Sequence, residues 1–237
     1  MKINYCSDLH LNYISKEELP AIFKALSQPA DVLVIAGDLF AKKGKRTNAA
    51  QDLVNRAEEH HSTDTYLHAL QLINDHESLI EKIYQALKEF NNPVIYVPGN
   101  HEFHGMSLLD GHEAYQNLFS ENVLFLNNKS VEINDHKFVC STMWYEPTTF
   151  KSSSDFHVHN FKKDFKKIAA DSRKYLEAEV TENSIVVTHM LPTSDCVHPM
   201  WQTAESNVVF VRDMRSLIEE RKPFAWIYGH THDPVSD

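Results

Sequence analysis

Five short hydrophobic runs are spread along the chain, and each gives way abruptly to polar residues. They are rich in β-branched and aromatic side chains, which is typical of buried strands. The runs lie at residues 3–6, 32–35, 94–97, 185–187 and 224–228. Between them the apolar positions follow a helical period at about 15–27, 107–119, 161–180 and 207–221. This alternation predicts an α/β fold built on parallel strands.

The first of these helices carries its own start signal. Ser15-Lys16-Glu17-Glu18 has the pattern of a capping box, in which a serine and a glutamate three residues later satisfy the free amides of a helix end. We therefore expect this helix to begin at Ser15.

The middle of the chain follows a different pattern. Short apolar runs at 123–126, 131–133 and 138–142 are separated by Asn-Asn and Asn-Asp pairs, which predict strands joined by tight turns. We interpret these runs as the start of a second sheet. Two sheets packed face to face, with helices outside, would bury all the predicted strands.

A polar, periodic segment separates the second and third strands. It contains few glycines or prolines and predicts two helices between about 47 and 90. We interpret residues 41–90 as a helical insertion in a single domain spanning 1–237. Two accounts stay open: a helical hairpin packed on the sheet edge, or a cap over the functional site.

The residues that follow the five runs are side chains that bind divalent metals. The segments are Asp8-Leu9-His10, Gly37-Asp38, Gly99-Asn100-His101-Glu102, Thr188-His189 and Gly229-His230-Thr231-His232. Parallel strands deliver their carboxyl ends to one edge of a sheet, so these side chains are expected to meet. Similar His and Asp pairs occur at 155–159, but they follow a loop signal at Lys151 to Ser154 instead of a predicted strand. The placement after strands therefore distinguishes the five motif segments from such pairs.

The number of donors favours two metal ions. Seven candidates stand at the strand ends: Asp8, His10, Asp38, Asn100, His189, His230 and His232. One ion usually takes three or four protein ligands, so seven suffice for two ions if a carboxylate bridges them. Asp38 is the natural bridge, because its strand reads as central. Two such ions would lie about 3.5–4 Å apart.

Charge then indicates the substrate. Two divalent ions outweigh the two aspartates, so the pocket is cationic and suits a phosphate group. A water shared by two ions is acidified and supplies hydroxide. His101 lies beside Asn100 and is not needed as a ligand, so it is placed to protonate the leaving oxygen.

Composition excludes several other classes. The formal net charge of −10 disfavours a long nucleic acid as partner, which would require a basic surface. No apolar run reaches the roughly 20 residues that span a bilayer, and the first residues contain no signal-peptide core. Three cysteines without a CxxC pair argue against a thiolate site. We expect a cytoplasmic protein without membrane partners, of undetermined oligomeric state.

The five motif blocks, in this order, resemble the calcineurin-like metallophosphoesterase family across nearly the whole chain. The resemblance implies a four-layer α/β/β/α sandwich of two mixed sheets and a dinuclear centre. It implies one metal held by Asp8, His10, Asp38 and His232, and another held by Asp38, Asn100, His189 and His230. It also implies that His101 protonates the leaving group or steadies the phosphate.

Two features depart from the family. In its protein phosphatase branch, the Gly-Asp motif continues with an Asp and an Arg that support the catalytic histidine. Here Ala41 and Lys42 stand at those places, which argues against that branch. Members also usually continue with strands that complete the second sheet, whereas Asp237 follows His232 by five residues. Whether these strands are missing stays open, and we expect the metal at His232 to bind loosely.

Some residues near the motifs have competing interpretations. Glu102 is either a partner of His101 or a carboxylate at a helix start. His104 and His198 are candidates for substrate contact, set against the interpretation of both as loop residues. Trp144 and Tyr145 are interpreted as packing residues more readily than as pocket lining.

We therefore expect hydrolysis of a small phosphomonoester or phosphodiester by a hydroxide bridging two ions of Mn, Fe, Zn or Ni. Ligand type alone does not choose among these metals. Two alternatives are a non-catalytic scaffold that retains the fold and a nuclease of the DNA-repair type.

Overall fold

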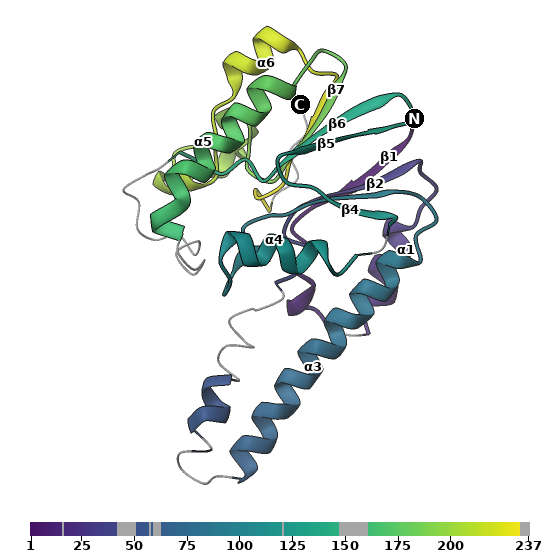
Figure 1. Ribbon diagram of the computed structural model, residues 1–237, viewed down its shortest axis with the longest axis vertical. Helices are drawn as coiled ribbons and strands as arrows, with labels where there is room; N and C mark the ends of the chain where they lie inside the picture. Colours follow the sequence, from purple (N-terminus) through teal and green to yellow (C-terminus); the bar gives the residue numbers. More distant parts are fainter. Residues whose placement is uncertain are drawn as a thin grey trace.

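The protein consists of two four-stranded sheets with helices on their outer faces, as seen in a computed structural model (Figure 1). The structure describes residues 1–15, 17–41, 51–56, 58, 63–119, 121–146 and 161–232. The loop signal at 151–154 and the His and Asp pairs at 155–159 lie outside the described residues.

The first sheet is entirely parallel in its described strands. Its order is β1 (Ile3–Cys6), β2 (Val32–Ala36), β3 (Val94–Val97) and β4 (Val123–Phe125). Each strand pairs with the next along the chain, and helices make the crossings between them. Successive crossovers of this kind bring all four carboxyl ends to one edge.

The second sheet is mixed. It consists of β5 (Lys129–Ile133), β6 (His136–Ser141), β7 (Ser184–Thr188) and β8 (Ala225–Ile227). Strands β5 and β6 form an antiparallel hairpin, and β6, β7 and β8 are parallel. Asn134 and Asp135 close the hairpin with φ values of 50° and 61°, as a two-residue turn with left-handed geometry requires.

The strand at 123–126 was predicted in the wrong sheet. It pairs with β3 in the first sheet, because α4 (Leu108–Gln116) connects the two strands and forms a parallel crossover. The chain then changes sheets between β4 and β5, where Asn128 has a φ of 50°.

The core has three layers, which follow from alternation along the strands. In β2, Val32, Val34 and Ala36 face the second sheet, where they meet Phe138 and Val187. The intervening Leu33 and Ile35 face the helices on the other side. A strand with both faces buried has to be apolar throughout, and all five residues of β2 are buried.

Helices cover the two outer faces, so the predicted four-layer sandwich is confirmed. Helices α1 (Leu19–Leu26), α3 (Thr63–Lys88) and α4 pack on the first sheet. Helices α5 (Phe161–Glu179) and α6 (Arg215–Arg221) pack on the second. Among the described residues, no helix combines the length and apolar character that crossing a membrane requires.

Two helix predictions need correction. Glu18 accepts hydrogen bonds from the amide and hydroxyl of Ser15, at 2.9 and 2.8 Å, but α1 begins only at Leu19. The helix predicted at 207–221 is α-helical only from Arg215. Its first part is a 3-10 segment, Glu205–Val209, and Val211 then pairs with Leu191 after β7. That pairing draws the chain away from a helical path.

Helix α3 is much longer than the sheet it crosses. Its 26 residues span about 39 Å at 1.5 Å per residue. The C-terminal half packs on the sheet through Leu79, Ile83 and Leu87, whereas the N-terminal half projects away from the sheets beside helical residues 51–56 (Figure 1). The role of 41–90 as a cap stays a prediction.

Candidate metal centre

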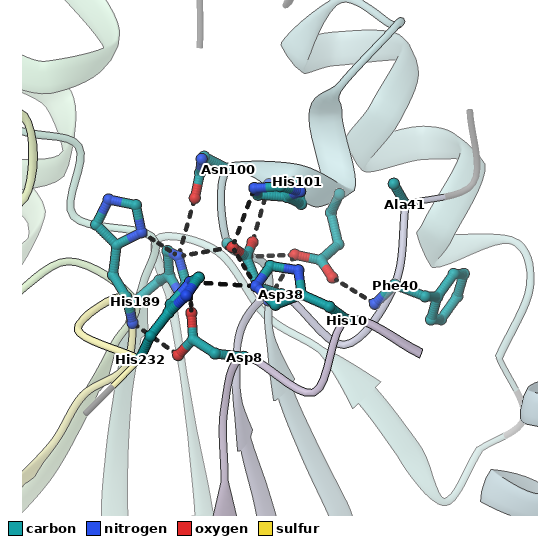
Figure 2. Close-up of polar contacts among 12 residues, drawn as sticks. Asp8, His10, Asp38, Phe40, Ala41, Asn100, His101, His189 and His232 are labelled. Atoms are coloured by element: carbon teal, nitrogen blue, oxygen red, sulfur yellow. Dashed lines mark hydrogen bonds and ion pairs between the residues drawn. The ribbon is translucent and has the colours of Figure 1, made fainter. Parts of the chain in front are cut away.

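The ends of five strands meet at one place. The described motif segments follow β1, β2 and β3 in the first sheet and β7 and β8 in the second. Their side chains converge at the carboxyl edges of both sheets (Figure 2). The structure thus brings together all seven residues that the sequence singled out as candidate ligands.

The backbone at these strand ends adopts a conformation that L-residues rarely use. Asp8, His10, Asp38, His230 and His232 have φ values of 54°, 44°, 53°, 66° and 57°. A left-handed residue that is not glycine costs roughly 1–2 kcal/mol. Strain of this kind concentrates at functional sites, where surrounding contacts over-determine the conformation. Five such residues among the seven candidates therefore point to function at this edge.

Hydrogen bonds join the first two strained segments side by side. The amide of Asp8 donates to the carbonyl of Gly37 at 3.0 Å, and the amide of His10 donates to the carbonyl of Asp38 at 3.0 Å. Leu11 continues the pattern by donating to Leu39 at 2.8 Å. The loops after β1 and β2 are therefore held together, and the two aspartates lie in one site.

One group of donor atoms surrounds the Nε2 atom of His189. This nitrogen lies 3.0 Å from Oδ1 of Asn100, 3.1 Å from Nδ1 of His230 and 3.4 Å from Oδ2 of Asp38. The other ring nitrogen, Nδ1, lies 2.8 Å from the carbonyl oxygen of Ala36, which fixes the ring orientation. Ligating histidines are oriented in this way by a partner on their second nitrogen.

The second group lies beside the first. Nε2 of His10 is 3.2 Å from Nε2 of His232 and 3.9 Å from Oδ2 of Asp38. Nε2 of His232 lies 3.3 Å from Oδ1 of Asp8. One ligand atom from each of Asp8, His10, Asp38 and His232 falls within 4.8 Å of the others, and so does one from each of Asp8, Asp38, His189 and His230.

The donor set fits divalent metal ions. Oδ2 of Asp38 is buried and accepts no hydrogen bond among the described residues, although three imidazole nitrogens lie 3.4–3.9 Å away, on His10, His101 and His189. Burying an unsatisfied carboxylate oxygen is costly unless a charge compensates it. Carboxylate, imidazole and amide oxygen are the ligands that borderline divalent metals accept.

Electrostatics in the metal-free protein supports the same interpretation. Burial lowers the pKa of His189, but the carboxylates of Asp38 and Asp8 outweigh burial and raise it to about 10. Burial also acts to raise the pKa of Asp38, but the charge of His189 holds it well below its usual range. A proton on His189 thus supplies positive charge to a site built around two aspartates.

The glycines that precede three of the motifs make room for the site. A Cβ at Gly37 would overlap Nδ1 of His189, and a Cβ at Gly99 would overlap Oδ1 of Asp38. At Gly229 it would lie 2.8 Å from Oδ2 of Asp8. Each glycine is therefore required by close approach of the backbone to a neighbouring ligand.

His101 lies next to the candidate ligands but on the solvent side. Its Nε2 is 3.8 Å from Oδ2 of Asp38, its ring centroid is 4.6 Å from that of His10, and its side chain is 24% exposed. Burial lowers its pKa to about 4. Ala41, at the place of the family's aspartate, binds Asn12 through backbone hydrogen bonds and offers no carboxylate to His101.

The histidines weighed as substrate contacts have different surroundings. His104 is buried at 6% exposure, not exposed as the loop interpretation has it, and its ring centroid lies 4.3 Å from that of His101. His198 begins a 3-10 turn and accepts a hydrogen bond from the amide of Met200 at 3.3 Å. Trp144 and Tyr145 are buried in the core beside α5, as the packing interpretation predicts.

Two neighbours of the site have roles that the sequence did not reveal. Phe210 stacks on His230 with centroids 4.4 Å apart, and nothing in its sequence context indicates this contact. Glu102 is fully buried, and it accepts hydrogen bonds not from the His101 side chain but from the amides of Asp38 and Gly99 and from the hydroxyl of Tyr96. Its place in a motif was the one signal available.

Comparison with known proteins finds similarity over nearly the whole chain. A protein of Acanthamoeba polyphaga mimivirus, described as uncharacterized protein L509, is 25% identical over 270 residues, covering 97% of this chain and 84% of its own. The crystal structure of a phosphopantetheinyl hydrolase from Mycobacterium tuberculosis is similar in fold. It matches with a TM-score of 0.55 and 15% identity, covering 100% of this chain and 84% of that one.

The family comparison covers nearly the whole chain. The model described as calcineurin-like phosphoesterase matches residues 1–234, which include all five motif segments. The chain therefore belongs to the calcineurin-like phosphoesterase family, whose members are metal-dependent hydrolases of phosphoesters.

Proposed function

We propose that this protein hydrolyses a small phosphoester at a centre of two divalent metal ions. The observation that carries the proposal is the sharing of donors between two groups. Asp8 and Asp38 belong to both, whereas His189 and His230 complete one and His10 and His232 complete the other. A single ion needs three or four protein ligands, so this arrangement supports two ions.

The distances support the ligand sets that the family resemblance implies. Asp8, His10, Asp38 and His232 would hold one ion, with Oδ2 of Asp38 facing both groups. Asp38, His189 and His230 would hold the other together with Asn100, whose Oδ1 lies 3.0 Å from Nε2 of His189. When bound, two such ions polarise phosphoryl oxygens and bring the pKa of a shared water toward neutrality. The donor types suit Mn, Fe, Zn or Ni.

The chain supplies the proton for the leaving group. His101 is partly exposed, and its Nε2 lies 3.8 Å from the carboxylate shared by both groups, so a substrate phosphate above the centre would contact its ring. An anionic phosphate beside the ring favours the protonated form, against the burial that lowers the pKa in the free protein. His101 then donates that proton to the leaving oxygen.

The same arrangement favours direct hydrolysis. The side chains gathered at the centre are ligand-type histidines, aspartates and an asparagine, with a partly exposed His101 beside them. With water activated at the centre as the nucleophile, attack opposite the leaving oxygen would invert configuration at phosphorus, and no phosphoenzyme would form. Retention of configuration with a chiral phosphate ester would contradict this step.

The substrate is proposed to be a small phosphorylated compound. The chain has a formal net charge of −10, which opposes a polyanion binding over a large surface, whereas ions in the site attract a single phosphate locally. A nuclease would depend on many phosphate contacts, and its activity would fall steeply with salt. If activity on a small diester changes little with salt, the small-substrate hydrolase is favoured over the nuclease.

A substrate panel tests the proposal. Metal-free protein is reconstituted with Mn²⁺, Zn²⁺, Ni²⁺ or Fe²⁺ and assayed on phosphomonoesters and on cyclic and linear phosphodiesters. A phosphopantetheinyl ester is included because the protein of similar fold from Mycobacterium tuberculosis is described as a phosphopantetheinyl hydrolase. We expect turnover that chelation abolishes and that Asp38→Asn eliminates. Metal-loaded protein without turnover on every substrate would instead favour the non-catalytic scaffold.

A further inference from the structure

We infer that Glu102 is a positioning residue of the metal centre, an inference that rests on the proposed function. Its carboxylate holds the backbone on both sides of Asp38, so that the Asp38 side chain projects between the two groups of donors. Glu102 touches none of the seven candidate ligand side chains in the hydrogen bonds that the structure gives it, and it acts through the backbone.

The carboxylate accepts four hydrogen bonds in a fully buried position. Oε2 accepts from the amides of Asp38 at 2.9 Å and Gly99 at 2.6 Å. Oε1 accepts from the amide of Phe40 at 3.3 Å and the hydroxyl of Tyr96 at 2.6 Å. Glu102 itself is 0% exposed. A buried carboxylate is tolerated when its oxygens are satisfied in this way.

These donors belong to two different strand ends. Asp38 and Phe40 follow β2, whereas Gly99 and Glu102 follow β3. The carboxylate therefore joins the loop that carries Asp38 to the loop that carries Asn100. In Figure 2 a dashed line joins the amide nitrogen of Phe40 to this network, and the ring of Phe40 points away from it.

Asp38 needs such support because of its conformation. Its φ of 53° is left-handed, a region that residues other than glycine rarely adopt without support from their surroundings. Three hydrogen bonds fix it: its amide donates to Glu102, its carbonyl accepts from His10 at 3.0 Å, and its Oδ1 accepts from the amide of His101 at 2.9 Å. The free Oδ2 is then directed at both donor groups.

Neither of two simpler roles for Glu102 accounts for all of these contacts. A carboxylate at a helix start accepts from the amide three residues before it, as Glu102 does from Gly99, but the amides of Asp38 and Phe40 belong to the loop after β2. A partner of His101 would bind the imidazole, and no bond between the two side chains is among those given for Glu102. Its hydrogen bonds instead join the loop after β2 to the loop after β3.

Three variants form a graded test on the full-length protein. Tyr96→Phe removes one of the four hydrogen bonds and leaves the three amides bound. Glu102→Gln keeps the volume, but an amide nitrogen cannot accept, so in either orientation at least one of the three backbone amides loses its acceptor. Glu102→Ala removes all four acceptor contacts. The dissociation constant for Mn²⁺ is measured by direct titration of chelated protein, and kcat and KM are measured at saturating Mn²⁺.

The expected order of effects is the order of lost hydrogen bonds. Loss of a partner that orients metal ligands typically weakens metal binding 10- to 100-fold. We expect the dissociation constant for Mn²⁺ to rise less than about threefold in Tyr96→Phe, about tenfold in Glu102→Gln and about 100-fold in Glu102→Ala. At saturating metal kcat falls and KM for the substrate stays unchanged. Wild-type Mn²⁺ affinity in Glu102→Gln would overturn the inference.

A measurement on the wild type covers the case in which a variant does not fold. In metal-free protein, the amides of Asp38, Phe40 and Gly99 should exchange with solvent at least about 100-fold more slowly than unstructured amides. Exchange at the unprotected rate would also overturn the inference. Mn²⁺ binding can be measured without turnover. If the wild type is inactive but Glu102→Gln still binds Mn²⁺ more weakly, the proposed function is refuted and the positioning role of Glu102 stands.

Discussion

The site requires a residue without a side chain at position 37, and Gly37→Ala tests this requirement. The φ of Gly37 is +88°. An alanine with this backbone conformation would destabilise the folded state by roughly 1–2 kcal/mol. The same methyl group would overlap Nδ1 of His189 and lie 2.7 Å from the amide nitrogen of Gly99. The buried ring of His189 therefore has to move.

The cost of that movement can be estimated from the contacts. If His189 withdraws, it loses its hydrogen bond to the carbonyl of Ala36, at 2.8 Å, which is worth about 0.5–1.5 kcal/mol. Together with the backbone strain, the free energy of unfolding should fall by about 2–3 kcal/mol. The displaced ring also leaves Asn100 and His230, which now lie 3.0 and 3.1 Å from its Nε2.

Denaturant unfolding of chelated protein measures the first effect, and the Mn²⁺ content after gel filtration measures the second. We expect one ion to be lost, because the group around His189 is disrupted. Gly111→Ala is the matched control: its Cβ would also meet a side chain at 2.7 Å, the ring of Phe103, but it lies within α4 and touches no candidate ligand. Wild-type stability and metal content in Gly37→Ala would refute this reasoning.

Three further predictions follow from the same geometry. His101→Ala should lower kcat about 100- to 10,000-fold with near-normal metal content; loss of both metals would contradict its catalytic role. His10→Ala should retain one ion, since the group of Asp8, Asp38, His189 and His230 is intact, and mass spectrometry of metals checks this. Metal binding near pH 8 should release about one proton, because ligation needs neutral imidazole and the pKa of His189 is raised to about 10. The affinity for metal should accordingly rise with pH up to about pH 10. Calorimetry in two buffers checks the prediction, and a result without proton release would contradict it.

The position of the site could be predicted from the sequence because it depends on topology. Apolar runs identify strands, and parallel strands place their carboxyl ends together whatever their exact packing. Asp38 and His189, 151 positions apart in the chain, were therefore expected to meet, and their side chains lie 3.4 Å apart. The family resemblance added the fold and the pairing of ligands with ions.

Other features of the site and fold depend on where side chains point and how segments connect, which the periodicity of the sequence does not reveal. The buried position of Glu102 follows from where its side chain points after β3, and a helix-start carboxylate has the same local sequence pattern. His104 was interpreted as an exposed loop residue, but it packs on His101 inside the site. The sheet to which residues 123–125 belong depends on the crossover through α4, which a short apolar run cannot reveal.

The central claim is that scattered side chains enclose two neighbouring cations bridged by Asp38. Anomalous diffraction from crystals soaked in Mn²⁺ measures this directly. We predict two peaks about 3.5–4 Å apart, one beside His10 and His232, the other beside His189 and His230, with the Asp38 carboxylate between them. A single peak, or none within coordination distance of Asp38, would contradict the account.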